Sequence, residues 1–189
     1  MRKMITVKIN GEERQYPQGA TYEDVTNDYQ QEYENLIALA ARDGKIRELF
    51  KKLTRDCEVT FFTLKDDVGN KTYVRSATML FLKAVFDVYG REAAQSCRVE
   101  FAIGNGSYIS PKEKINATEE NAAKIRNRMR ELVEAKTPFL KRSYSLDNAM
   151  ELFRKEGMKD KEKLFRYRRG SFVNIYEMDG YYDYYYGYM

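Results

Sequence analysis

The chain of 189 residues contains no histidine and no tryptophan. Without imidazole, Ser-His-Asp and Cys-His catalytic groups and every histidine-ligated zinc site are excluded within this sequence. The two cysteines, Cys57 and Cys97, are too few for a disulfide framework or for a structural zinc site. Such cysteine usage indicates a reducing cytoplasm.

Long hydrophobic runs are also missing. No apolar segment approaches the roughly 18 residues that a membrane helix needs, and the N-terminal MRKMITVKINGE becomes polar too early for a secretory signal. We therefore expect no membrane partner. Apolar residues make up 43% of the chain and charged residues 33%, so the composition supports a packed core and excludes wholesale disorder. The length fits one domain or two small ones.

The net charge of +4 is unevenly distributed. Residues 1–64 carry 10 basic and 11 acidic side chains, whereas residues 112–169 carry 17 basic and 10 acidic ones. The densest basic run consists of Lys159, Lys161, Lys163, Arg166, Arg168 and Arg169. Such a run can attract phosphate or nucleic acid. A solvated helical face has the same pattern and is the simpler interpretation. Binding to nucleic acid is therefore the weaker interpretation of this run.

The first 64 residues have the pattern of a small β-grasp unit. Asn10-Gly11 predicts a hairpin with a two-residue turn, because asparagine and glycine readily adopt the positive φ values that this turn requires. Thr21, with Asp24 three residues later, predicts a capping box that opens a helix to about Gln31. Strands are expected over five segments: 4–9, 12–16, 36–41, 45–48 and 57–64. This order of elements is typical of a ubiquitin-like fold.

Residues 65–72 are polar, charged and glycine-containing, so we interpret them as a linker between domains 1–64 and 73–189. Helical spacing of apolar residues predicts a helix from about Thr72 to Tyr89, and Gly90 is placed to end it. Further strands are expected over 99–104, 139–145 and 171–178, and further helices over 118–136, 145–157 and 159–169. The second domain is therefore also α+β.

Several segments of this second domain resemble one family when taken in order. They are YVRSATMLFLKAVFDVYG, VEFAIGNGSYI, RNRMRELVEAKTPF, SYSLDNAMELFRKEG and GYYDYYYGYM. Together with the β-grasp unit, they resemble the TGS domain and the second additional (editing) domain of threonyl-tRNA synthetases, a domain type also related to alanyl-tRNA synthetases. The resemblance implies an editing site built from His-Ser-x-x-His and Tyr-x-Asp-x-Cys-x-Gly-x-His motifs.

Both histidines of the first motif are replaced in this chain. Arg75 and Met79 occupy their positions, while Ser76 between them is retained. Residues four apart share a helix face, so Arg75 and Met79 point into the same space. A guanidinium and a thioether neither bind a metal nor relay a proton under ordinary conditions. Arg75 suits phosphate or carboxylate recognition, with a surface ion pair as the alternative; Met79 suits packing better than ligand recognition.

The second motif has lost its cysteine and its histidine, and Tyr185 and Met189 stand in their places. If residues 181–188 form one strand, Tyr182 and Tyr184 share one face, while Tyr181, Asp183 and Tyr185 share the other. We expect the chain to bend at Gly187 so that both ends of the motif face one cleft. The positions that match the family's editing residues, and so define the candidate cleft, are Arg75, Ser76, Met79, Asp183, Tyr185 and Met189. Nucleobase stacking is the role considered for Tyr181, Tyr182 and Tyr184, with core or interface packing as the favoured alternative.

The combination of this architecture with a degenerate site resembles bacterial uridine kinase-like nucleoside kinases, which carry both domains ahead of a P-loop kinase domain. The chain contains no G-x-x-x-x-G-K-[ST] motif. The resemblance therefore implies an N-terminal fragment without catalytic activity or cofactor, and assigns ATP and Mg²⁺ to the missing kinase domain. Its expected partners are that domain and a nucleoside or nucleotide ligand. The alternative function is a stand-alone RNA- or tRNA-binding protein derived from a synthetase editing domain.

Overall fold

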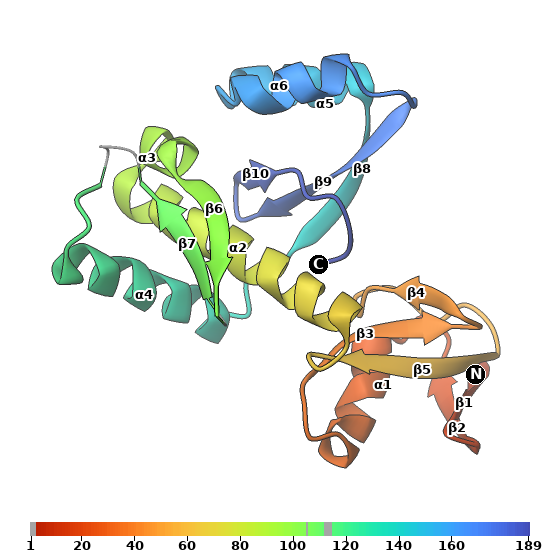
Figure 1. The fold of residues 1–189 in the computed structure, drawn as a ribbon. Helices are drawn as coiled ribbons and strands as arrows, with labels where there is room; N and C mark the ends of the chain where they lie inside the picture. The colour runs from red at the N-terminus through yellow and green to blue at the C-terminus, as the bar shows by residue number, and fades with distance from the viewer. Residues whose placement is uncertain (1–2, 105, 112–114) are drawn as a thin grey trace. The chain divides into compact units, whose positions relative to one another are not determined.

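The computed structural model describes residues 3–104, 106–111 and 115–189. The chain divides into two compact units, Met1–Ser76 with Gly187–Met189, and Ala77–Tyr186. Helix α2 (Asp67–Tyr89) starts in the first unit and continues into the second (Figure 1). Among the helices of the described residues, none combines the length and the apolar character required to cross a bilayer.

The first unit is a five-stranded mixed sheet with one helix. Its elements are β1 (Met4–Ile9), β2 (Glu12–Pro17), α1 (Tyr22–Tyr29), the short 3₁₀ helix η1 (Gln30–Glu32), β3 (Ile37–Arg42), β4 (Lys45–Arg47) and β5 (Cys57–Thr63). The strand order is β2-β1-β5-β3-β4, and the central pair β1 and β5 is parallel. This topology confirms the predicted β-grasp fold.

Local sequence signals set the boundaries of these elements. Asn10 and Gly11 take φ values of +52° and +89°, as the predicted hairpin turn requires. The Thr21 hydroxyl accepts a hydrogen bond from the Asp24 amide, and the Asp24 carboxylate accepts one from the Thr21 amide at 2.7 Å. The capping box is therefore present, and α1 begins at the next residue, Tyr22.

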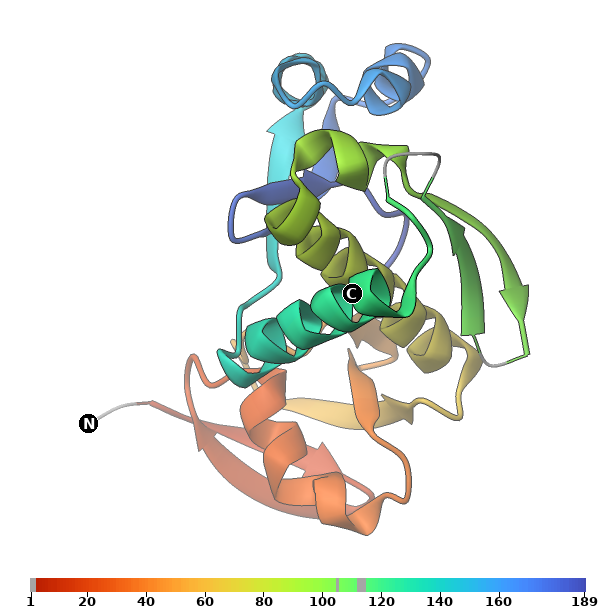
Figure 2. The same cartoon turned by 90° about the vertical axis from the view of Figure 1, so that its left-hand side faces the viewer.

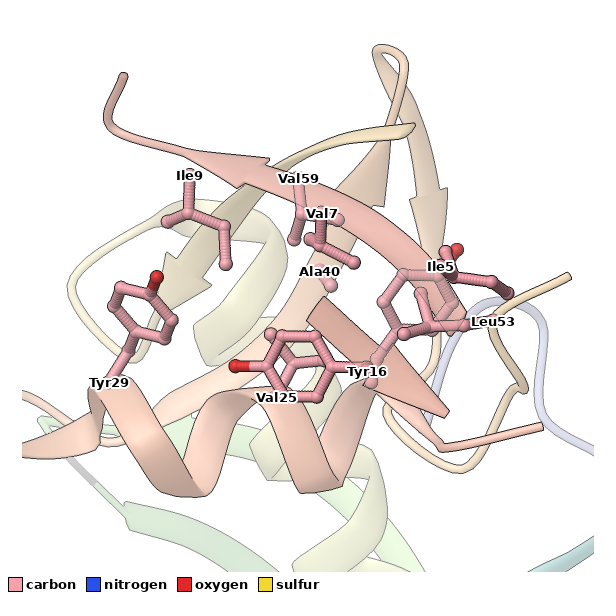
Figure 3. Close-up of a cluster of buried hydrophobic side chains, with 10 residues drawn as sticks. Ile5, Val7, Ile9, Tyr16, Val25, Tyr29, Ala40, Leu53 and Val59 are labelled. Carbon is pink, nitrogen blue, oxygen red and sulfur yellow. The ribbon is translucent and has the colours of Figure 1, made fainter. Parts of the chain in front are cut away.

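The core of the first unit lies between α1 and the sheet (Figure 3). Its buried residues come from every major element and are Ile5, Val7, Ile9, Tyr16, Tyr22, Val25, Tyr29, Ala40, Leu53 and Val59. Alternate residues of β1 point to this side, as the period of a strand dictates. The helix is only eight residues long, so this packing, rather than helix propensity, holds it in place.

The second unit combines a three-stranded antiparallel sheet, a hairpin and helices. After α2 come α3 (Arg91–Ser96), β6 (Arg98–Ile103), β7 (Gly106–Ser110), α4 (Glu119–Glu134), β8 (Leu140–Ser145), α5 (Leu146–Lys155), α6 (Lys159–Arg166), β9 (Phe172–Met178) and β10 (Tyr181–Asp183). The sheet order is β10-β9-β8, and β6 pairs with β7. Both units are α+β, as predicted. The sequence Gly104-Asn105-Gly106 also favours a hairpin turn, but Asn105 lies outside the described residues.

Helix α2 lies between the β6–β7 hairpin on one side and β8 on the other (Figure 2). Helix α4 is joined to α2 by a hydrogen bond from the Tyr89 hydroxyl to the Asn121 side chain at 2.8 Å. Helices α5 and α6 pack on the sheet through an apolar cluster of Ala149, Phe153, Met158, Phe165, Val173 and Ile175. The residues of α6 that face away from this cluster are free to carry charge.

The start of α2 differs from the prediction. The helix begins at Asp67 rather than near Thr72, so most of the predicted linker over 65–72 is helical. The Asp66 carboxylate accepts hydrogen bonds from the Thr63 amide at 2.7 Å and the Thr63 hydroxyl at 3.0 Å, and the Asp66 carbonyl accepts one from the Asn70 amide. These bonds let the helix follow β5 almost directly, because a polar composition does not prevent a capped first turn.

The C-terminal strand is also shorter than the prediction of 181–188 implied. β10 ends at Asp183, whose carboxylate accepts a hydrogen bond from the next amide, that of Tyr184, at 2.7 Å. This local bond gives the Tyr184 amide a side-chain partner where β10 ends. The alternation of tyrosines beyond Asp183 therefore does not hold. Gly187, the predicted hinge, has φ +131°.

Candidate functional site

The site in the second unit is organised around Asp183, the acidic residue that the degenerate motif retains. Asp183 is the last residue of β10, and only 4% of its surface is exposed. The turn before β10 is fixed by Lys83 of α2, which is 2% exposed. The Lys83 ammonium donates to the Asp179 carbonyl at 2.7 Å and forms ion pairs with the carboxylates of Asp87 and Asp179.

The Asp183 carboxylate has three polar neighbours. The Lys161 ammonium lies 3.3 Å from Oδ1. Oδ1 also accepts the Tyr184 amide, and Oδ2 accepts the Tyr181 hydroxyl at 3.5 Å. Lys161 itself is flanked by the more exposed carboxylate of Asp160 at 3.5 Å. A buried carboxylate is thus paired and hydrogen-bonded, as burial of a charge requires.

Burial and charge act in opposite directions on this pair. Burial raises the pKa of Asp183, although the Lys161 ammonium and the Tyr184 amide both lower it. Burial lowers the pKa of Lys161, but the carboxylates of Asp183 and Asp160 outweigh that effect and the net shift is upward. Lys161 therefore stays a cation at physiological pH and balances the carboxylate when Asp183 ionises.

Two tyrosine hydroxyls lie near the same carboxylate. Burial, followed by the charge of Asp183, raises the pKa of both Tyr181 and Tyr185 well above the ordinary value. Both remain neutral phenols at any physiological pH. The buried Tyr185 hydroxyl meets no strict hydrogen-bond geometry within the described residues, but it lies close enough to the Asp183 carboxylate for a hydrogen bond to contribute to its raised pKa.

These groups line a cavity of about 350 Å³. The wall comes from α2 and α3 (Thr78, Leu82, Ala94, Gln95), from Cys97 and the start of β6 (Arg98, Val99, Glu100), from the α5–α6 connection and α6 (Met158, Asp160, Lys161), and from the C-terminal segment (Tyr181, Asp183, Tyr184, Tyr185). All of these residues belong to the second unit. The volume is at the lower end of the range of small-molecule sites, about 300–1,000 Å³.

The structure brings together only some of the residues predicted from the sequence. Tyr181, Asp183, Tyr184 and Tyr185 line the cavity, whereas Met79 is completely buried and does not. Tyr182 and Tyr184 pack against the apolar cluster beneath α5 and α6. The ring of Tyr184 meets Phe165 edge-on, with centroids 5.0 Å apart, and its hydroxyl accepts a hydrogen bond from Arg168. The tyrosines expected to stack on a base therefore already have neighbours in the protein.

Arg75, Ser76 and Met189 belong to the first unit. There Arg75 Nε donates to the Tyr188 carbonyl at 2.8 Å, and the Met189 amide donates to the buried carboxylate of Glu48 at 3.3 Å. We call Arg75, Glu48 and residues 187–189 the tail cluster. Arg75 thus donates to a main-chain carbonyl within this unit. The predicted cleft combines residues of both units and stays a prediction.

Two residues were missed as members of these sites. Lys161 was counted within the basic run, and Glu48 was not singled out. A signal for Lys161 was available: Met158, Lys161 and Phe165 recur at spacings of three and four, which places the lysine on the inward face of α6. Nothing comparable marks Glu48, because its partner Met189 lies 141 residues further along the chain.

The cavity has binding groups but no activated nucleophile. Cys97 lines it, yet burial raises the pKa of the thiol, and its Sγ donates to the Ala93 carbonyl at 3.4 Å. Nucleophilic cysteines instead have lowered pKa values, beside a cation or an imidazole. Among the described residues, no group of three His, Cys, Asp or Glu side chains could hold a metal ion.

No protein-family model matches the chain. Sequence comparison finds threonine–tRNA ligases. The enzyme of Thermotoga maritima is 27% identical over 184 residues, which cover 90% of this chain. That of Carboxydothermus hydrogenoformans is 25% identical over 183 residues, and that of Syntrophotalea carbinolica is 31% identical over 153 residues, or 73% of the chain. The chain is threonyl-tRNA synthetase-like.

This synthetase-like chain spans 28% of the length of the first two relatives and 23% of the third. The comparison confirms the resemblance to threonyl-tRNA synthetases that the motifs indicated. The assignments to a TGS domain and to a uridine kinase-like protein stay predictions. Because the match covers 90% of the chain, the similarity extends over both units.

Proposed function

We propose that the second unit is a synthetase-derived editing domain that has lost its chemistry and now binds a small molecule. The observation that supports this most directly is the cavity around Asp183: it keeps a buried, paired carboxylate but is lined by phenols and a high-pKa thiol. The positions expected to carry imidazole and thiolate hold Arg75, Met79, Tyr185 and Met189. Retained binding groups without a nucleophile or a base favour recognition over hydrolysis.

The loss of chemistry can be tested with mischarged tRNA. The intact chain should not accelerate the deacylation of threonine tRNA that has been mischarged with serine above the rate in buffer. A bacterial threonine–tRNA ligase serves as the positive control in the same assay. Rapid deacylation by this chain, retained after treatment with a metal chelator, would contradict the proposal, because it would require a catalytic group that the cavity lacks.

For the first unit we propose a TGS domain, which the β-grasp topology supports. For the whole protein we propose a regulatory, noncatalytic role ahead of an ATP- and Mg²⁺-dependent nucleoside kinase domain. This rests on the similarity of the GYYDYYYGYM segment to such kinases. Sequencing the gene downstream of Met189 tests it. A G-x-x-x-x-G-K-[ST] motif in the same reading frame is the expected result, and a stop codon at that point would contradict it.

RNA binding is the second candidate, and the exposed surface of α6 is the observation in its favour. Lys159, Lys163 and Tyr167 recur every four residues on one side of this helix, and Tyr167 is 76% exposed. Basic and aromatic groups side by side suit a nucleic acid backbone and its bases. A titration with tRNA at low and moderate salt tests this function. Phosphate-driven binding must weaken steeply as salt rises.

A further inference from the structure

A second cavity of the second unit lies beside α4 and has a largely apolar wall. Its volume is about 580 Å³, within the range of small-molecule sites. The apolar wall includes Phe81 of α2, Ile109 of β7, Ile115 of the segment before α4, and Ile125 and Met129 of α4. Ile115 and Ile125 are 8% exposed, and the other three are half-buried. These side chains therefore leave apolar surface that a ligand can remove from water.

The main polar groups at the edge of this cavity already bind one another. The Thr118 hydroxyl accepts a hydrogen bond from the Asn121 amide at 3.3 Å. The Asn121 side chain donates to the Asn116 carbonyl at 2.9 Å and accepts one from the Tyr89 hydroxyl at 2.8 Å. Each bond uses a group that would otherwise serve a polar ligand. The affinity of this cavity must therefore come mainly from apolar contact.

The charges at the edge are balanced as well. Among the described lining residues, Arg126 is the one cation and Glu119 the one carboxylate, and they lie 3.4 Å apart. Glu119 and Glu120 also occupy the first turn of α4, where they compensate the positive end of the helix. An anionic ligand would therefore meet neither an unpaired cation in this lining nor an uncompensated helix end.

The same pairing disfavours a segment of polypeptide as the occupant. A peptide carries an amide and a carbonyl at nearly every residue, and these groups need partners when they leave water. The bonds among Asn116, Thr118 and Asn121 leave few such partners at the edge of the cavity. A small molecule without a peptide backbone avoids this cost.

From this arrangement we propose that the cavity beside α4 binds an uncharged, largely apolar molecule of one or two rings. The ligand packs against Phe81, Ile125 and Met129, and a charge added to the same ring system weakens its binding. The inference goes beyond the proposed function, because this site is distinct from the cavity around Asp183. Of the described lining residues, the two cavities share Cys97 alone.

The test is fluorescence titration of the whole chain with two probes at neutral pH, 2-naphthol and 2-naphthoate. They have the same ring system, and only the naphthoate is charged. The chain contains no tryptophan, so the naphthyl emission is measured without interference from indole. 2-Naphthol should bind at least tenfold more tightly than 2-naphthoate, because burial of an unpaired carboxylate is costly.

Two substitutions that fill the cavity locate the site. Ala122→Leu on α4 and Ala117→Leu just before it each place a larger side chain in the lining, and each should weaken 2-naphthol binding at least tenfold. Both alanines are exposed, and leucine is a good helix former, so the variants should fold. Ala102→Leu is the matched control, because Ala102 is also exposed but lies outside the lining.

Each contrary outcome overturns a defined part of the inference. Equal or tighter binding of 2-naphthoate would overturn the uncharged class of ligand. Parent-like affinity in both cavity-filling variants, or an equal loss in Ala102→Leu, would overturn the assigned site. Failure of 2-naphthol to bind a chain shown to be folded by circular dichroism would overturn the inference as a whole. None of these results bears on the cavity around Asp183, so the proposed function is tested separately.

Discussion

Asp183 illustrates how one residue can keep its place when the residues around it have changed. It is buried at the end of a strand, paired with Lys161 and bonded to the amide of the following residue. Each of these contacts satisfies the carboxylate without help from the replaced positions. Its retention is consistent with a structural role and a binding role at once. A substitution of Tyr185 alone, which leaves these contacts of Asp183 in place, separates the two roles.

The first prediction concerns Tyr185 at alkaline pH. Its pKa in the folded chain is raised well above the unfolded value of about 10, so the folded state holds this proton more tightly. The free energy of unfolding should therefore fall as pH rises above 10, by up to about 1.4 kcal/mol per pH unit from this group. Tyr185→Phe should lose less free energy of unfolding between pH 9 and pH 11 than the parent chain, as measured by urea titration.

Tyr186→Phe provides the comparison for that experiment. Tyr186 is 85% exposed, so its removal should leave the pH dependence of the parent chain unchanged. An identical slope in Tyr185→Phe and Tyr186→Phe would show that the Tyr185 hydroxyl is accessible to solvent in the folded protein.

At the residue scale, the sequence predicts those features that depend only on neighbouring residues. The turn at Asn10-Gly11 and the capping box at Thr21 depend on neighbours within three positions, and both are present. The Asp183 motif was also found, because it is contiguous. The partner of Asp183 was not, since Lys161 lies 22 positions earlier and the fold brings it there.

At the scale of elements, α2 carries two Lys–Asp pairs that are four residues apart but differ in burial. Lys83 pairs with Asp87 and is 2% exposed, whereas the Lys71 side chain pairs with Asp67 and is 63% exposed. Lys83 also holds the turn between β9 and β10 through the Asp179 carbonyl at 2.7 Å. Buried bonds to charged groups contribute far more than exposed ion pairs do.

The second prediction follows from this difference. Lys83→Met should lower the free energy of unfolding of the second unit by about 2–3 kcal/mol, because it leaves the carbonyl and carboxylates of the turn without their donor. Lys71→Met should have little measurable effect. Denaturant titration of both variants makes the comparison. Equal stability of the two would mean that the buried ammonium does not hold the turn.

The third prediction concerns the junction between β5 and α2, where the expected linker is helical. A Cβ atom on Gly69 would lie 2.0 Å from the Thr63 carbonyl oxygen. Gly69→Ala should therefore destabilise the chain by about 1–3 kcal/mol through this overlap, even though alanine favours helices by about 1 kcal/mol. Gly106→Ala is the control, since its Cβ would meet the Ile103 carbonyl at an ordinary 3.6 Å. Thermal unfolding measures both.

The two errors in element boundaries have a common origin. Composition predicted a linker at 65–72 and a long strand at 181–188, but in each segment one aspartate carboxylate accepts a backbone amide nearby. At Asp66 such a bond helps a helix start early, and at Asp183 it ends a strand early. Periodicity describes the middle of an element, whereas these single hydrogen bonds decide its ends.

At the scale of the whole molecule, the chain passes between the two units twice. It enters the second unit at Ala77 within α2 and returns to the first at Gly187. The tail cluster receives the returning segment: Arg75 binds the Tyr188 carbonyl, and its guanidinium carbon lies 2.9 Å from where a Cβ on Gly187 would be. No local pattern could predict this arrangement, because its members are far apart in sequence.

The fourth prediction tests the tail cluster. Arg75→Met should increase amide hydrogen exchange in residues 187–189 and lower the free energy of unfolding of the first unit by about 1–2 kcal/mol, because the bond to the Tyr188 carbonyl is lost. Arg55→Met, which removes an exposed arginine in the same unit, should change neither quantity measurably. Exchange at residues 187–189 that matches the parent chain would show that Arg75 does not retain the tail.

The return of the tail has a consequence for anyone who dissects this protein by deletion. A piece that stops at Ser76 contains the whole β-grasp sheet but deprives Glu48 and Arg75 of the main-chain groups that they hold in the intact polypeptide. Weak expression or poor folding of such a piece could then be attributed wrongly to the loss of the second unit. Attaching residues 187–189 to this piece through a short Gly-Ser linker would show whether the loss of these three residues alone explains the defect.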